Sequence, residues 1–169
     1  MLSEDRRRLY FDALHDCEKA VSNKRHDEIK HEMRIAEERF TAGLITKDEL
    51  SKGLRALTDE ILGYSVLFQS EQDFSDYFKG HPFIYEQFYV HEREHAQVYK
   101  KHGVPVLWGV HRLVRDGDIG FAPFIGPQFP NDMPMRRRLE IELESIEAVS
   151  QMSEHDEQDA ESLRRILGR

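Results

Sequence analysis

Apolar residues recur every three or four positions along much of this chain, which is the spacing of one face of an α-helix. Four such stripes predict four amphipathic helices, each with one face for a core and one for water. The stripes are Leu9, Tyr10, Ala13, Leu14, Cys17, Ala20 and Val21; Ile29, Met33, Ala36 and Phe40; Leu50, Leu54, Leu57, Ile61, Tyr64 and Phe68; and Leu139, Leu143, Ile146 and Val149.

Capping residues predict where several helices begin and end. Gly43 can end the second of these helices, and the run Thr46-Lys47-Asp48-Glu49 is a capping box that starts the third. The fourth is expected to begin near 131–132 and to reach the 150s. Short helices are predicted over 70–78 and 160–167, the latter after a polar stretch over 150–159 with a second capping pattern at 153–157.

The pattern changes after Gly103, where two β-rich runs cover 104–114 and 119–125. The Asp116-Gly117 pair between them predicts a tight turn and therefore a β-hairpin. A two-stranded ribbon is marginal in water, so it must pack on the helices or pair with another chain, which leaves a homo-oligomer open. Trp108, Phe121 and Phe124 are the expected packing residues, and 126–134 is expected to be irregular.

These patterns predict an α+β protein that is mostly α, with four to five helices and a small β-hairpin after the long helix over 82–102. A chain of 169 residues is about the size of one domain. We therefore expect a single domain over 1–169, with a helical part over 1–103, the hairpin and its loop over 104–130, and the C-terminal helices over 131–169.

The helix predicted over 82–102 contains the sequence His91-Glu92-Arg93-Glu94-His95. Histidines four residues apart lie one above the other on a helix, so both imidazoles can reach one metal ion. At about 100° per residue, His91, Glu92 and His95 turn toward the apolar face, whereas Arg93 turns to water. Ionisable groups that face a core cost free energy unless they are paired or bind a metal. The sequence therefore predicts a metal site.

Through His91, Glu92 and His95 the chain resembles the zincin metallopeptidases, over this one helix. The resemblance implies that the two histidines bind Zn²⁺ and that Glu92 is the general base acting on a metal-bound water. It also implies a peptide or protein substrate. The function predicted on this basis is a zinc-dependent, peptidase-like hydrolase.

The third metal ligand is not fixed by the motif, because no H-x-x-G-x-x-H signature follows it. Glu142 lies within the apolar face of the helix that carries Leu139 and Leu143, which makes it the first choice. Glu147, at the edge of that face, is the second, and His111 in the first β-strand is the remaining candidate. Three protein ligands and a water would form an open, catalytic site.

Two other hypotheses fit the same residues. The first is a non-enzymatic helical interaction protein in which His91, Glu92 and His95 form a polar network with Arg112 or Arg138. The second is a closed structural zinc site, which needs four protein ligands. A second metal site is not expected: Glu28 and His31 have E-x-x-H spacing, but both lie opposite the apolar stripe of their helix.

Composition limits the classes of binding partner and the cellular compartment that we expect for this protein. A net charge of −8 and a pI near 5.6 argue against nucleic acid and anionic membranes as partners. The single cysteine, Cys17, excludes an intrachain disulfide and favours a reducing compartment. No apolar run approaches 18 residues, so no membrane span is expected. A cytoplasmic protein is the resulting prediction.

Overall fold

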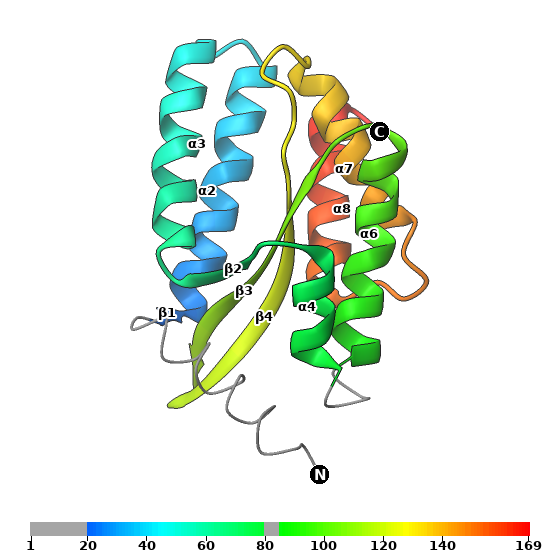
Figure 1. The fold of residues 1–169 in the computed structure, drawn as a ribbon. Coiled ribbons are helices and arrows are strands. Elements are labelled where there is room, and N and C mark those ends of the chain that lie inside the picture. The colour runs from blue at the N-terminus through cyan, green and yellow to red at the C-terminus, as the bar shows by residue number, and fades with distance from the viewer. Residues whose placement is uncertain (1–19, 80–84) are drawn as a thin grey trace.

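The computed structural model of the chain describes residues 20–79 and 85–169. A twisted β-sheet lies between a pair of helices, α2 and α3, and a larger helical group made of α4, α6, α7 and α8 (Figure 1). The protein is α+β and mostly α, as predicted. Six α-helices occur in the described residues, one more than the upper expectation.

The α2–α3 pair follows the capping signals of the sequence. Helix α2 covers Asn23–Thr41, and Gly43 follows it with a positive φ of 73°. Helix α3 covers Lys47–Leu62, and Thr46 and Glu49 form the predicted capping box. The predicted helical pair with a glycine turn is therefore confirmed.

Two of the predicted helices include residues that form strands in the structure. Helix α3 ends at Leu62, and Ser65–Phe68 instead form strand β2, which pairs antiparallel with β3. Val21 lies in the short strand β1, Val21–Ser22, which pairs parallel with β3. In both places apolar residues at helical spacing became strand because the central strand offers their backbone groups partners. Ala20 precedes β1 outside any helix or strand. The remaining residues of the first predicted stripe, Cys17 included, lie outside the described residues.

The predicted hairpin is confirmed. Strand β3, Val106–Arg115, pairs antiparallel with β4, Asp118–Pro127, along its whole length. Asp116 and Gly117 form the turn with φ values of 51° and 88°, as a two-residue hairpin turn requires. Strand β3 is central in the sheet, because β4 and β2 both pair with it.

The long helix predicted over 82–102 consists of two parts, as far as the described residues show it. Tyr85–Val90 form a π-helix, η1, and His91–Lys101 form helix α6. The helix ends at His102 and Gly103, as predicted. The short helix before it, α4, covers Glu71–Phe78 and is capped by Ser70.

The C-terminal helices are divided differently from the prediction. Helix α7 covers Met135–Glu147 and ends before the 150s. Helix α8 covers Glu154–Leu167 and begins six residues earlier than expected, because Ser153 and Asp156 form a capping box at its start. Residues 154–159, predicted as a polar connection, are therefore the first turns of a helix.

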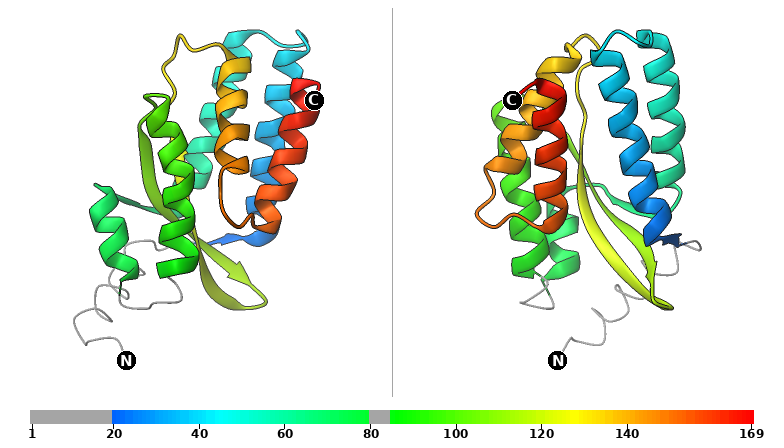
Figure 2. Two further views of the ribbon diagram at one scale, coloured as in Figure 1. Left: turned by 90° about the vertical axis from the view of Figure 1, so that its right-hand side faces the viewer. Right: turned by 180° about the vertical axis from the view of Figure 1, so that it is seen from behind.

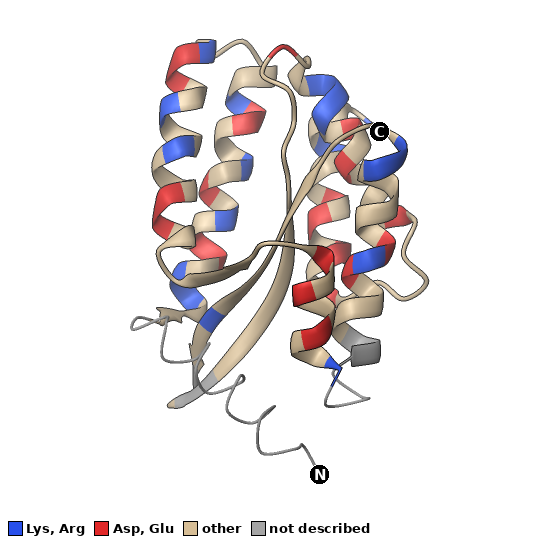
Figure 3. Cartoon of the chain, in the orientation of Figure 1, with Lys and Arg blue, Asp and Glu red and all other residues tan. Residues whose placement is uncertain are grey.

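One face of the sheet packs on α4, η1 and α6, so the hairpin packs on the helices, the first of the two predicted arrangements. Trp108 and Val110 of β3 contact a cluster with Phe74, Tyr89 and Ala96 from α4, η1 and α6. A second apolar cluster joins α7 to α8 through Leu139, Leu143 and Leu163, among others. Charged side chains gather on the helices, whereas the sheet carries few in its described part (Figure 3). No helix within 20–79 or 85–169 has the length and apolar character that a membrane span needs.

Candidate metal centre

Helices α6 and α8 bring three potential metal ligands together. His91 and His95 lie on consecutive turns of α6, and their Nε2 atoms are 3.1 Å apart. Asp156, in the first turn of α8, places Oδ2 3.2 Å from His91 Nε2 and Oδ1 3.5 Å from His95 Nε2. Within the described residues this is the one group of three His, Cys, Asp or Glu residues whose ligand atoms converge in this way.

The three side chains fit a zinc ion. Bonds of about 2.1 Å at tetrahedral angles separate neighbouring ligand atoms by roughly 3.4 Å. The two Nε2 atoms, 3.1 Å apart, and Asp156 Oδ2, 3.2 Å from His91 Nε2, come close to that spacing, and the other Asp156 oxygen lies 3.5 Å from His95 Nε2. Two imidazoles and one carboxylate are also a donor set that Zn²⁺ accepts. The His91 side chain is 20 % exposed and that of Asp156 is 15 % exposed, so solvent reaches the centre.

Helix α7 fixes the orientation of the His95 ring. His95 Nδ1 lies 3.1 Å from the backbone carbonyl oxygen of Ser145. A carbonyl oxygen can accept a hydrogen bond but cannot donate one. The proton therefore sits on Nδ1, and Nε2 keeps its lone pair toward His91 and Asp156. A hydrogen bond from a histidine ring to a carbonyl oxygen is also the usual support of a metal-binding imidazole.

The capping box of α8 fixes Asp156. The backbone N–H and the hydroxyl of Ser153 donate to Asp156 Oδ2 at 2.8 and 2.7 Å. Burial opposes ionisation of this carboxyl, but hydrogen bonds from His91 Nε2 and from Ser153 outweigh it and hold its pKa far below the usual range. Asp156 is thus a carboxylate, as a metal ligand must be. Its hydrogen bond raises the pKa of His91 in turn.

Glu92 is buried near His91, His95 and Asp156. Burial raises the pKa of its carboxyl to about 7, while the nearby His95 and His91 act in the opposite direction. The predicted inward orientation of His91, Glu92 and His95 is therefore confirmed for all three, although His91 is only partly buried. A buried carboxyl with a raised pKa has the proton affinity that a general base needs.

The structure does not bring Glu142 to the two histidines. Its carboxylate accepts a hydrogen bond from Arg34 Nη1 at 2.7 Å, and the same nitrogen donates to Glu37 at 2.8 Å. Glu142 therefore belongs to a buried ion cluster between α2 and α7. The carboxylate beside His91 and His95 comes from Asp156 of α8 instead.

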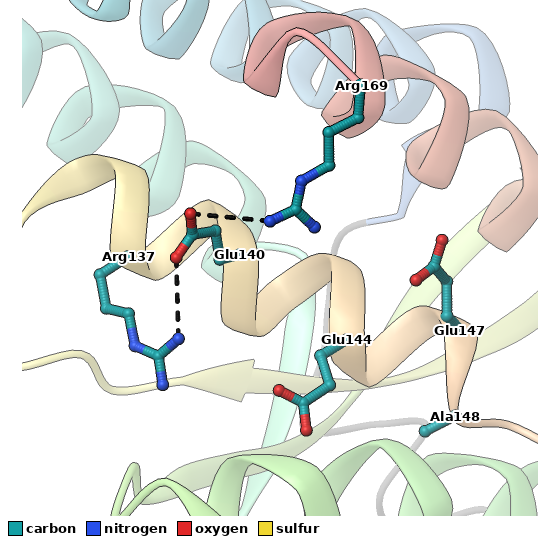
Figure 4. A pocket seen from close by; sticks show the side chains of 6 residues that line it. All are labelled: Arg137, Glu140, Glu144, Glu147, Ala148 and Arg169. Atoms are coloured by element: carbon teal, nitrogen blue, oxygen red, sulfur yellow. Dashed lines mark ion pairs between the residues drawn. The ribbon is translucent and has the colours of Figure 1, made fainter.

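The second choice, Glu147, is also placed elsewhere. It pairs with Arg164 at 2.7 Å and borders a hollow of about 400 Å³ beside α7. Figure 4 shows this hollow, in which Glu140 pairs with Arg137 and Arg169. None of the three metal-centre residues lines it.

His111 lies in a different part of the interior. Its Nδ1 atom is 2.6 Å from Ser65 Oγ, and its ring stacks on Phe124 at 3.9 Å. Burial lowers its pKa to about 3, so the ring is neutral. The expected network partner Arg138 is also remote, because it donates to the carbonyl oxygens of Met133, Pro130 and Asn131.

Sequence reasoning missed Asp156. The sequence predicts a polar connection over 150–159, and only the capping pattern that begins at Ser153 indicates a helix there. Helical periodicity relates residues within one helix, whereas the contact between α6 and α8 depends on how two distant helices pack. No family model, curated protein or solved structure matches this chain.

Proposed function

We propose that this protein is a zinc-dependent hydrolase of the peptidase type. His91, His95 and Asp156 are the proposed ligands, and Glu92 is the proposed general base. The observation that carries the proposal is the convergence of His91 Nε2, His95 Nε2 and an Asp156 oxygen, with the His95 tautomer set by Ser145. Three ligands leave a coordination position for water, which favours a catalytic site over a closed structural one.

The chemistry follows from the positions of the side chains. A zinc ion supplies a Lewis acid and lowers the pKa of bound water when it is present. Glu92 follows His91 directly in the chain and shares its buried side, so it can take the proton of the attacking water. It can then return that proton to the leaving nitrogen as the amide C–N bond breaks. Asp156 and Ser145 hold the two histidines in place throughout.

Metal content is the first test. The chain, purified without an affinity tag and supplied with zinc, should hold about one zinc per chain, as a single three-ligand site requires. His95→Ala and Asp156→Asn should lose the metal. The matched control is His31→Ala, which removes an exposed histidine from α2 and should leave the zinc content unchanged.

The role of Glu92 needs a separate variant. Glu92→Gln keeps the shape of the side chain, so it should retain the zinc and lose hydrolysis of peptide substrates. Retention of full hydrolysis by Glu92→Gln would overturn the general-base role. Loss of zinc in this variant would instead place Glu92 among the ligands.

A non-enzymatic interaction protein is the second candidate, and one observation favours it. The ion pair between His91 and Asp156 can satisfy the polar groups of the centre without any metal. In that case the wild type, folded and exposed to zinc, would hold no metal, and His95→Ala would change stability only. A peptide or protein partner and a cytoplasmic location belong to both candidates.

A further inference from the structure

The connection between α7 and α8, residues 148–153, leads directly to the proposed ligand Asp156. In the left view of Figure 2 it is the orange loop that joins the lower ends of the two helices. At the end of this loop, Ser153 donates its backbone N–H and its hydroxyl to Asp156. The position of the connection therefore decides where the Asp156 carboxylate lies relative to α6.

Glu94 of the motif helix holds the middle of this connection. Its Oε2 atom accepts a hydrogen bond from the backbone N–H of Ser150 at 2.8 Å and another from the Ser150 hydroxyl at 3.0 Å. Hydrogen bonds to a carboxylate are about twice as strong as those between neutral groups. Glu94 directly precedes His95 in α6, so the helix that carries the two histidines also holds the loop that leads to the third ligand.

A second contact between α6 and this part of the chain is of a different kind. His95 Nδ1 lies 3.1 Å from the carbonyl oxygen of Ser145 in α7, and this contact orients a proposed ligand directly. The contact between Glu94 and Ser150 involves neither a ligand atom nor the direct hydrogen-bond partner of one. Glu94 can therefore act on the centre in two ways, through the position of the backbone over 150–156 or through its charge.

We propose that Glu94 is a positioning residue of the metal centre: by holding Ser150, it keeps Asp156 within reach of a metal ion bound to α6. This inference rests on the proposed function, because it concerns the same metal site. His91 and His95 stay together without Glu94, since a helix fixes the relation of residues one turn apart. Asp156 has no such local constraint relative to α6, so loss of Glu94 should free the third ligand and leave the two histidines in place.

The test separates the hydrogen bonds of Glu94 from its charge and needs no turnover. Co²⁺ is titrated into the full chain in place of Zn²⁺, because its visible spectrum reports the number and geometry of its ligands. Glu94→Ala should bind Co²⁺ about tenfold more weakly, as loss of a supporting group does, and its spectrum should change as Asp156 is released. Glu94→Gln should stay within about threefold of the wild type, because an amide oxygen also accepts two hydrogen bonds.

Arg93 and Ser150 provide the comparison variants. Arg93, the other middle residue of the motif, is 54 % exposed and pairs with Glu71 at 3.6 Å, so Arg93→Ala should change the Co²⁺ affinity by less than about twofold. Ser150→Ala removes one of the two donors and should weaken binding about threefold. Combined with Glu94→Ala it should add nothing, because both variants break the same contact. Circular dichroism checks that each variant is folded, and if Glu94→Ala is not, Ser150→Ala tests the contact by itself.

The failures of the two proposals differ. If the wild type binds no Co²⁺, the metal centre and this inference both fall. If the wild type binds Co²⁺ and Glu94→Ala has the same affinity and spectrum, Glu94 does not position Asp156, while the metal centre stands. Equal weakening in Glu94→Gln and Glu94→Ala would assign the effect to the lost charge and would also overturn the positioning role.

Discussion

At the scale of single residues, Ser153 both caps helix α8 and holds Asp156 by a hydrogen bond. A comparison with Ser70, which caps α4, distinguishes the two roles. Ser153 and Ser70 both cap helices and both donate to an aspartate three residues later, but only Asp156 is a proposed metal ligand. We expect Ser153→Ala to weaken zinc binding about tenfold, because supporting hydrogen bonds hold a ligand in place.

Ser70→Ala is the control for this measurement. Each alanine should cost about 1 kcal/mol of stability through loss of the cap, but Ser70→Ala should leave zinc affinity unchanged. Calorimetric titration of zinc into both folded variants measures the difference. Equal zinc affinities would show that the cap does not position Asp156.

A second prediction at this scale concerns the buried cluster of Arg34, Glu37 and Glu142. Burial and the charge of Glu142 raise the pKa of Glu37 to about 7, and Asp159 acts in the same direction, although Arg34 opposes them. A carboxyl with a higher pKa in the folded chain favours folding while it is protonated. It loses that contribution as the pH rises through the folded pKa.

The free energy of unfolding of the wild type should therefore fall between pH 5 and 8 relative to Glu37→Gln, by up to about 3 kcal/mol. Glu38→Gln, whose side chain is 45 % exposed on the same helix, should follow the wild type. Urea unfolding at several pH values measures this. Parallel pH profiles for the wild type and Glu37→Gln would contradict the expectation.

At the scale of elements, the β3–β4 hairpin depends on a close approach at Gly109. A Cβ atom there would overlap the ring of Phe124, which is itself stacked on His111 and cannot easily move. We expect Gly109→Ala to destabilise the protein by about 2 kcal/mol, which is typical of overpacking.

Gly120 on β4 gives the matched control, since a Cβ there meets open space and its φ is not positive. Gly120→Ala should leave stability within about 0.5 kcal/mol of the wild type. Thermal unfolding of both variants compares them directly. If Gly109→Ala unfolds at the same temperature as the wild type, the Phe124–His111 stack rearranges at little cost in free energy.

At the scale of the whole molecule, the proposed metal would link α6 to α8, which are distant in the sequence. A ligand that binds the folded state alone stabilises it by about 4 kcal/mol at a thousand times its dissociation constant. Zinc should therefore raise the denaturant midpoint of the wild type and of Glu147→Gln, whose ion pair lies elsewhere. Asp156→Asn should show no such increase.

The sequence by itself determined much of the local structure and three of the four residues of the candidate centre. Capping boxes, glycines and periodicity specify nearby backbone geometry, so α2, the start of α3 and the β3–β4 turn were predicted correctly. The same locality placed His91, Glu92 and His95 on one inward face, because a helix fixes the relation of residues one turn apart.

Only the tertiary structure decided the rest. Residues 65–68 became a strand because β3 offers them backbone partners, which overrides a helical spacing of apolar residues. Asp156 took the place predicted for Glu142, because the packing of the helices placed Asp156 beside the histidines and Glu142 beside Arg34. Contacts between distant segments depend on the packing of the whole chain, and local sequence patterns do not encode it.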